Sequence, residues 1–591
     1  MDKAELQNWF DKGVLPTVVR VLLFSYAIII VTSSFAGVVD KFDDAIPLLD
    51  GVLAQQGRIP TLDFYSFYPP LGIYINAGLF ELLGRSVLAV RLFGAVLFLL
   101  VLLLASRFFT KQFPYAQPVA SVVVLLFAAA IGNALSEPSW PGFAVSVLAL
   151  LTYLYSPYGK WNPVWTVGLA GVLTGLALLY RINFGGYVVI VVAFDLLVPW
   201  LPRGGAIRDR FRLKQDLLTA TTFLVVLSLV FSVICFAIYG RHAVTTVVNL
   251  VVTAQRVMNL RSFIELTSST EVLLTVALPA GWFFLRALLG APKVSPKAFL
   301  PAIIAMVVLC ITLAERAHLS VIPMVVTAEV CAVTFLHLCV YRLERSEFCL
   351  LLFYCGFVHY YLSRADWYHL RLLPIVVALL LPFLVLPSSS MGVKAKGTAI
   401  AVLLTATFVC LIAFETRPPA ANIPKGFRLL ADLVRHPHMS DSDRLLGPTP
   451  PGSEWLSVYD DEGELQALRY VRTRSRPDEA IFSGVPDHSR IYMNNLRFYF
   501  LAGRPIGVRV FQLEPVVATE EPVQQEIIHD LDQNKVKWVI LDSGFWSPDK
   551  TFLAHHYLGS RLLDQYIMSQ YHEEARFGEY RILYKTAVQA P

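Results

Sequence analysis

Charged residues are scarce in this chain. Of its 591 residues only 16% are Asp, Glu, Lys or Arg, and 56% are hydrophobic, whereas about a quarter of a soluble protein is charged. The apolar residues fall in runs of roughly 17–23 residues up to Phe414, a length that crosses the hydrocarbon core of a bilayer. After Arg417 the composition becomes that of an ordinary soluble domain. The low charge therefore excludes a wholly soluble protein.

Cysteine is also scarce, and several motifs of known chemistry are missing. All seven Cys residues lie in or beside apolar runs, and none has a Cys-x-x-Cys or metal-ligand spacing, which excludes a disulfide framework. The segment after Arg417 contains no Gly-rich phosphate loop and no nucleophile elbow. The absence of any Asn-x-Ser/Thr sequon disfavours a glycosylated eukaryotic ectodomain.

The runs predict a polytopic α-helical membrane protein with about thirteen transmembrane helices. We assign residues 1–417 to the membrane domain and 418–591 to a C-terminal soluble α/β domain. The first run is too long for a signal peptide and lacks a clear cleavage site, so we expect a retained helix. The predicted spans are 16–38, 86–108, 118–135, 140–157, 164–181, 184–201, 217–239, 271–288, 298–314, 319–341, 348–362, 370–387 and 397–414.

The basic residues determine the predicted orientation. With this set of spans, the Lys- and Arg-rich short loops, from Lys3 to Lys396, all fall on the side of the N-terminus, which is therefore cytoplasmic. The C-terminal domain then lies in the periplasm or outside the cell, and we expect a multi-pass protein of a bacterial inner (plasma) membrane. Because the positive charge is confined to short loops, it indicates topology and not nucleic-acid binding.

The outer loops hold ionisable residues of another kind. The first outer loop, 39–85, is long, and the others carry charged groups at the ends of spans. Charge near hydrocarbon costs about 2.5–3.5 kcal/mol at a helix centre, so a cluster on one side is a functional candidate, although solvated helix ends are the alternative. The ionisable residues at the ends of spans are Glu137, Arg181, Glu315, Arg316, His318, Arg364, Asp366 and His369.

The soluble domain reads as alternating helices and strands. Helix-like segments are Glu462–Thr473, Pro522–Gln533 and Phe552–Gln570, and strand-like segments are Ala480–Val485, Lys537–Asp542 and Tyr580–Tyr584. This alternation favours a partly parallel sheet.

The first outer loop contains an ordered series of motifs. An acidic pair follows the first span, then come Gly-x-x-Pro, Asp-Phe, Pro-Pro-Leu, Gly-x-Ser and an Arg that opens the second span. These are Asp43–Asp44, Gly57–Pro60, Asp63–Phe64, Pro69–Leu71, Gly84–Ser86 and Arg91. The series resembles the first loop of C-type (GT-C) membrane glycosyltransferases, nearest to the branch with protein O-mannosyltransferases and lipid A aminoarabinose transferases. Looser matches are Arg181–Asn183 and Ser363–Asp366 with His369.

The resemblance implies specific roles. Such enzymes have a catalytic Asp in the first outer loop and use polyprenyl-phosphate-linked sugar donors. By position Asp43 matches that Asp, Asp44 stands where the family often has Glu, and Glu137 falls where many members keep an acid. Some members bind a divalent metal, Mg or Mn, through these acids, so a metal is a possible cofactor. The resemblance therefore predicts a glycosyltransferase, with a glycan, lipid or protein as acceptor.

The chemistry requires the same kinds of group. A carboxylate that takes the proton of an attacking hydroxyl is worth about 10²–10⁴-fold in rate, and attack assisted by one base gives inversion. The leaving lipid phosphate needs cations, and Arg binds phosphate oxygens in a bidentate way. The candidate phosphate ligands are Arg364 and His369 first, then Arg181, Arg316 and His318. Additional substrate-site candidates are Asp63, Asp366, Tyr65 and Tyr68.

Alternatives remain for the residues and for the protein. Asp43 could cap the next helix, Asp63 could be a turn residue or a partner of Arg58 or Arg91, and Asp40 and Asp50 are expected to be solvated. The aromatic residues could form an interfacial belt. A flippase of lipid-linked glycans would carry charges at mid-helix, and a scaffold that binds a cell-wall partner would not explain the cluster of ionisable residues.

Overall fold

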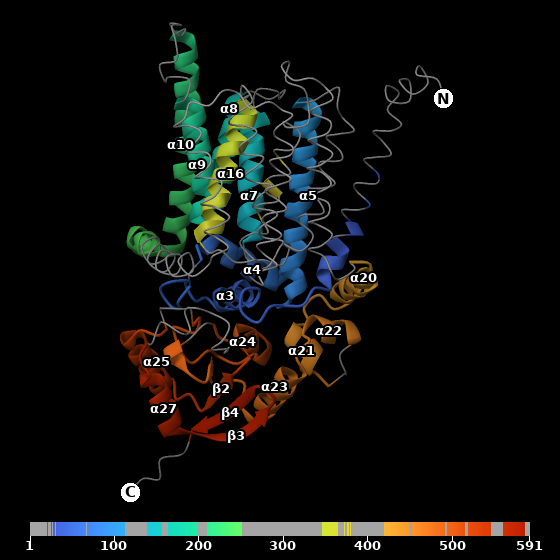
Figure 1. Ribbon diagram of the computed structural model, residues 1–591, viewed down its shortest axis with the longest axis vertical. Helices are drawn as coiled ribbons and strands as arrows, with labels where there is room; N and C mark the ends of the chain where they lie inside the picture. The colour runs from blue at the N-terminus through green and yellow to red at the C-terminus, as the bar shows by residue number, and fades with distance from the viewer. Residues whose placement is uncertain are drawn as a thin grey trace, which may run out of the picture.

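The described residues form three stacked parts in a computed structural model of the chain. They are 31–66, 68–112, 139–155, 163–197, 210–250, 345–363, 419–448, 452–490, 493–513, 518–544 and 559–585, with single positions between 21 and 29 and between 372 and 379. A bundle of upright helices lies at one end, and a C-terminal domain, residues 419–585, lies at the other (Figure 1). A layer made by the first outer loop separates them.

The helix bundle coincides with predicted spans. Its described helices are α5 (Val87–Gln112), α7 (Trp140–Tyr155), α8 (Pro163–Tyr180), α9 (Ile182–Leu197), α10 (Arg210–Tyr239) and α16 (Arg345–Ser363). Within the described part, Val87–Phe109 and Asp216–Leu250 are long and apolar enough to cross a membrane. The predicted spans that these six helices do not match lie largely or wholly outside the described residues. The total of about thirteen therefore stays a prediction.

Small residues allow the helices of the bundle to pack closely. A Cβ atom added at Gly171 of α8 would lie 2.8 Å from the carbonyl oxygen of Phe223 in α10. Close approach at small residues is typical of membrane helices, because lipid provides no hydrophobic force between them. Trp140, at the start of α7, is fully buried and its indole N–H donates to the carbonyl of Gly94 at 3.0 Å. The core of the bundle is thus a set of directly packed helices.

The first outer loop folds into two short helices. They are α3 (Ala45–Gln55) and α4 (Pro70–Leu83). Pro70 occupies the first turn of α4, where its missing N–H has no cost. The amide of Asn76 in α4 donates to the carbonyl of Pro47 in α3 at 3.0 Å. The two helices pack on each other and form the layer beneath the bundle in Figure 1.

The C-terminal domain is an α/β unit. Its four-stranded sheet has the order β1-β2-β4-β3, with β1 and β2 parallel and the other pairs antiparallel. The elements are α20 (Pro419–Arg435), α21 (Asp441–Leu446), α22 (Ser453–Val458), α23 (Glu462–Arg474), β1 (Ile481–Gly484), α24 (Leu496–Ala502), α25 (Glu521–Gln533), β2 (Trp538–Asp542), α27 (Leu562–Gln570), β3 (Tyr571–Phe577) and β4 (Tyr580–Lys585).

The segments predicted in this domain agree with the structure, but helices α20, α21, α22 and α24 and strand β3 were not predicted. The helices at 462–473 and 522–533 and the three strands are present, and the described end of Phe552–Gln570 contains α27. Strand β3 was missed because it follows α27 without a turn residue, and its His572, Glu573 and Glu574 are exposed. A strand with so few apolar residues lacks the usual alternation.

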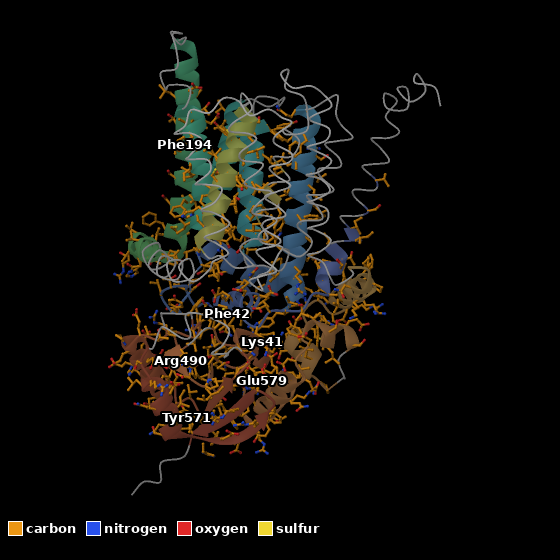
Figure 2. All side chains as sticks on the ribbon, in the orientation of Figure 1. Lys41, Phe42, Phe194, Arg490, Tyr571 and Glu579 are labelled. Carbon is orange, nitrogen blue, oxygen red and sulfur yellow. The ribbon has the colours of Figure 1, made fainter. Side chains whose placement is uncertain are left out.

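The domain is joined to the first outer loop by polar contacts. The ammonium of Lys41 lies 2.7 Å from Asp461, and the carbonyl of Lys41 accepts the backbone N–H of Arg497 at 3.0 Å. Figure 2 labels Lys41 and Phe42 at the level where the layer meets the domain. Gly84, at the end of α4, has a φ of 76°, and a Cβ there would lie 2.8 Å from the carbonyl carbon of His438. The backbones of the loop and the domain are therefore in direct contact at Gly84.

Asp50 of α3 is part of this junction. Its carboxylate is fully buried and accepts from Ser66 Oγ at 2.8 Å and from the amide of Gln512 in the domain at 2.7 Å. The expectation that Asp50 is solvated was wrong, because its carboxylate faces the domain. Burial raises the pKa of Asp50 to about 8, against the two hydrogen bonds that lower it.

We predict that Asp50→Asn weakens the dependence of stability on pH. The folded protein holds a proton on Asp50 that the unfolded chain, with an ordinary pKa of about 3.9, has released. The stability contributed by this group is therefore present below about pH 4 and is lost as the pH rises towards about 8. The midpoint of thermal unfolding in detergent, followed by Trp fluorescence, should fall less steeply with rising pH over this range in the variant. An unchanged slope, or an equal effect of the exposed Asp460→Asn, would contradict this.

Candidate active site

A short turn positions Asp43. After the first described helical residues, the carboxylate of Asp40 accepts the backbone N–H groups of Phe42 at 2.8 Å and Asp43 at 2.6 Å. An Asp side chain that bonds the backbone two and three residues ahead closes an Asx-type turn. Asp40 was expected to be a solvated residue, and the structure instead gives it this role. Phe42 and Ala45, on either side of the acidic pair, are buried, so the turn presents Asp43 at the edge of a packed loop.

Asp44 faces the interior. Only 9% of its surface is exposed, its Oδ2 accepts the N–H of Asp40 at 3.0 Å, and it lies 3.9 Å from the guanidinium of Arg91. Burial raises the pKa of Asp44 to about 7, although the charge of Arg91 opposes the shift. Asp44 also occupies the N-cap position of α3 without a side-chain cap bond. The two neighbouring carboxylates therefore have different surroundings, since Asp43 is only half-buried.

Arg91 holds the backbone around the acidic pair. It is fully buried in α5 and donates to the carbonyl oxygens of Phe35 at 3.0 Å, Gly37 at 2.8 Å and Val38 at 3.4 Å. Five donors in a rigid fork suit Arg for several acceptors at once. Arg91 was considered as a partner of Asp63, and the structure pairs it with Asp44. Its bonds fix the loop to the start of the second span.

Arg181 forms a second group of polar contacts, at the helix ends next to the first outer loop. It lies between α8 and α9 and donates to the hydroxyl of Tyr68 at 3.1 Å and to that of Tyr360 at 3.1 Å. Its guanidinium carbon is 4.8 Å from the centre of the Tyr68 ring, a cation–π distance. The hydroxyl of Tyr360 also lies 3.1 Å from Ser139 Oγ. Arg181 and Tyr68, which were predicted separately as a phosphate ligand and as a substrate-site residue, thus lie in contact, together with two hydroxyl residues that sequence reasoning missed.

His359 is another residue that sequence reasoning missed. Its Nδ1 lies 2.9 Å from the hydroxyl of Tyr187, and it precedes Tyr360 on α16. The Tyr187 and His359 rings are 6.1 Å apart in an edge arrangement. Neither Tyr360 nor His359 follows a motif, because both lie inside the apolar run that predicted α16, and the site candidates chosen from the sequence come after that run.

Two predicted site residues take part in other contacts. Asp63 is exposed, accepts the N–H of Ile59 at 2.7 Å, and its carbonyl accepts from Arg58 at 2.6 Å. The alternative that Asp63 is a turn residue next to Arg58 is the one that the structure supports. The backbone N–H of Tyr65 donates to the carbonyl of Arg509 at 3.0 Å, so this part of the loop lies against the C-terminal domain.

Other predicted site residues lie outside the described part of the chain. They are Glu137, Arg316, His318, Arg364, Asp366 and His369. Among the residues that the structure does describe, no group of three or more His, Cys, Asp or Glu side chains could hold a metal ion. Asp44 already has Asp40 and Arg91 as partners, so Asp43 would have to combine with residues such as Glu137. A divalent metal stays a prediction.

Comparison with known proteins gives structural similarity only. No family model matches the sequence, and no curated protein does. The Archaeoglobus fulgidus oligosaccharyltransferase in its apo form has 13% identity and a TM-score of 0.46, over 90% of this chain and 70% of that chain. The same organism's oligosaccharyltransferase AglB, in complex with an inhibitory peptide and a dolichol-phosphate, has 15% identity and a TM-score of 0.46, over 99% and 75%.

A third similar structure is ArnT from Cupriavidus metallidurans in its apo state. It has 14% identity and a TM-score of 0.43, and the match covers 97% of this chain and 99% of that chain. Similarity at this level assigns no donor, acceptor or catalytic residue to this chain.

We predict that Arg91→Met strongly destabilises the protein. The substitution leaves buried carbonyls of Phe35 and Gly37 without their donor, and each such group costs about 1–3 kcal/mol. Arg91→Lys should be intermediate, because an ammonium is a compact charge and not a fork. The measurement is the midpoint of thermal unfolding in detergent. The matched control is Arg107→Met on the exposed side of α5, and an equal midpoint in both Met variants would refute the role of Arg91.

Proposed function

We propose that this protein is an inverting glycosyltransferase. It moves a sugar from a polyprenyl-phosphate donor to an acceptor outside the cytoplasm, and Asp43 is the general base. The donor is embedded in the membrane by its lipid, and the acceptor is a glycan, a lipid or a protein of the cell envelope. The proposal places the reaction at the outer surface of a bacterial inner membrane.

One observation carries the proposal. The first outer loop connects a half-buried carboxylate, Asp43, with a guanidinium, Arg181, through the packed helices α3 and α4. Asp43 precedes α3, and Tyr68, which contacts Arg181, lies two residues before α4. A carboxylate at the start of this layer and a guanidinium of the helix bundle that contacts the layer at Tyr68 are the two kinds of group that transfer from a lipid phosphate requires.

The chemical step can be written with these groups. The hydroxyl of the acceptor loses its proton to the carboxylate of Asp43 while its oxygen forms a bond to the anomeric carbon of the donor sugar. The bond between that carbon and the phosphate oxygen breaks, and the lipid phosphate leaves with the electron pair. Attack from the face opposite to the phosphate inverts the configuration, and no second carboxylate nucleophile is needed.

The surroundings of Asp43 and Arg181 fit these roles. Asp44 is less suited to this role, because it is buried whereas Asp43 is half-buried and more accessible to an acceptor. Arg181 is oriented by two tyrosine hydroxyls that accept its N–H groups, which fixes its fork towards one geometry. Arg364, His369, Arg316 and His318 remain proposed additional phosphate ligands, and Glu137 and Asp366 remain proposed acidic groups of the site.

We predict that Asp43→Asn lowers sugar transfer by about 10²–10⁴-fold, the usual contribution of a general base. An amide cannot take the proton of the acceptor, although it preserves the shape of the side chain. The assay is incorporation of labelled sugar from polyprenyl-phosphate hexoses and pentoses into membranes. Asp44→Asn should retain more activity, and the exposed Asp478→Asn should match the unsubstituted protein. Full activity of Asp43→Asn would require another base.

We predict that Arg181→Lys reduces transfer and that Arg181→Ala reduces it further. Lysine keeps the charge but loses the planar fork that bridges Tyr68, Tyr360 and a phosphate. Because the phosphate gains charge as it leaves, kcat should fall more than the KM for the donor rises. Steady-state kinetics in nanodiscs provides the measurement, with the exposed Arg241→Lys as the control on the same side. A change in KM alone would make Arg181 a ground-state binding residue.

A further inference from the structure

A polar cavity lies between the first outer loop and the C-terminal domain, and Asp43 is not among the residues that line it. Its volume is about 580 Å³, which is within the usual range for small-molecule sites, about 300–1,000 Å³. Helices α3 and α4 form one wall, and α21, α23 and α24 with the segment after α24 form the other.

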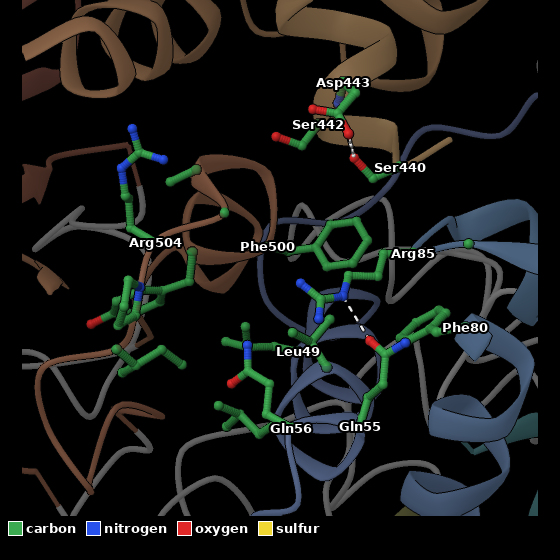
Figure 3. Close-up of a pocket in the computed structure, with 18 of the residues that line it drawn as sticks. Leu49, Gln55, Gln56, Phe80, Arg85, Ser440, Ser442, Asp443, Phe500 and Arg504 are labelled. Carbon is green, nitrogen blue, oxygen red and sulfur yellow. Dashed lines mark hydrogen bonds between the residues drawn. The ribbon is translucent and has the colours of Figure 1, made fainter. Parts of the chain in front are cut away.

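Three guanidinium groups line this cavity. Arg85 comes from the loop after α4, Arg472 from α23, and Arg504 from the turn after α24. In Figure 3, Arg504 lies on one side of the cavity and Arg85 on the other, with Phe500 between them in this view. The acidic lining residues are Glu81 and Asp443. Arg side chains remain charged, so positive charge exceeds negative charge in the cavity.

The partners of these guanidinium groups are mostly neutral, although Arg472 also lies 3.5 Å from the carboxylate of Asp443 and donates to the carbonyl of Ser442 at 3.3 Å. Arg85 Nε donates to Gln55 Oε1 at 2.7 Å. Arg504 is held by the carbonyls of Arg472 at 2.9 Å and Ser475 at 3.0 Å, which are neutral acceptors. Burial lowers the pKa of Arg85 and of Arg504, and the charge of Arg472 adds to the effect on Arg504. Like charges held together in a partly buried space favour an anion between them.

The rest of the lining suits a sugar. Gln55 and Gln56 have amide groups, and Ser440 and Ser442 have hydroxyl groups, and both kinds of group can bond sugar hydroxyls. The rings of Phe80 and Phe500 lie 6.4 Å apart and offer an apolar wall. The lining residues belong to the first outer loop and the C-terminal domain and not to the helix bundle.

We propose that this cavity binds a phosphorylated saccharide, which is attracted by the positive charge of Arg85, Arg472 and Arg504. If the chain is the glycosyltransferase proposed above, this saccharide belongs to the acceptor, and in that respect the inference rests on the proposed function. The cavity then gives the C-terminal domain a direct part in choosing the acceptor.

The test is calorimetric titration of the full chain in phosphatidylcholine nanodiscs with glucose 6-phosphate, glucose and inorganic phosphate. We expect glucose 6-phosphate to bind more tightly than phosphate, and glucose to give no signal. Arg85→Gln and Arg472→Gln should each weaken binding about tenfold, the effect of losing one charge-assisted hydrogen bond. Arg469→Gln, on the exposed side of the same helix α23, should bind normally. Thermal unfolding verifies that each variant is folded.

Two outcomes would overturn the proposal. One is that glucose 6-phosphate does not bind at millimolar concentration. The other is that Arg85→Gln and Arg472→Gln bind it as well as Arg469→Gln does. A second titration, in nanodiscs that contain phosphatidylglycerol, identifies the source of the phosphate. If the anionic lipid competes, the ligand is a lipid-linked headgroup, and unchanged affinity indicates a soluble one.

The Asp43→Asn protein separates this inference from the proposed function. Asp43 does not line the cavity, so the variant should bind glucose 6-phosphate with unchanged affinity while it loses sugar transfer. Unchanged binding together with full transfer activity would contradict the role of Asp43 and leave the cavity assignment standing. If Asp43→Asn loses transfer as expected but glucose 6-phosphate does not bind in the cavity, the cavity assignment is contradicted and the role of Asp43 stands.

Discussion

The burial of one guanidinium, that of Arg91, is the constraint on which the site depends. A charge removed from water is costly unless hydrogen bonds and a counter-charge replace its hydration. Here three backbone carbonyls between residues 35 and 38 and the carboxylate of Asp44 provide them. The chain must therefore fold around Arg91 after the first span. This fold fixes the position of Asp43.

The C-terminal domain acts on the same loop from the other side. The N–H groups at the start of α24 bond the carbonyl of Lys41, two residues before Asp43. Asp441 of α21 accepts the N–H of Val87 at 2.8 Å, at the start of α5. The domain is thus a support of the loop and of the second span, and not a separate appendage. Loosening it would disturb the geometry around Asp43 even though the domain is distant in sequence.

Much of the fold and part of the site could be predicted from residue patterns. Long apolar runs indicated α5, α7, α8, α9, α10 and α16, and alternation indicated the sheet. Arg181 and Tyr68, two residues predicted for the site in separate roles, lie in contact. Tyr360, Ser139 and His359 could not be found, because a polar side chain inside an apolar run has no periodicity of its own. Asp40 and Asp50 were wrongly expected to be solvated, because acidic residues in loops are usually exposed.

The sequence by itself determined that the chain is built around apolar helices, that acidic residues follow the first span, and that a soluble composition begins after Arg417. These properties are local, because hydropathy and spacing act within one segment. Only the tertiary structure decided which of two adjacent carboxylates is buried, that Asp50 faces the C-terminal domain, and that three distant arginines share one cavity. Such contacts join residues hundreds of positions apart, and their energies depend on burial that no single segment specifies.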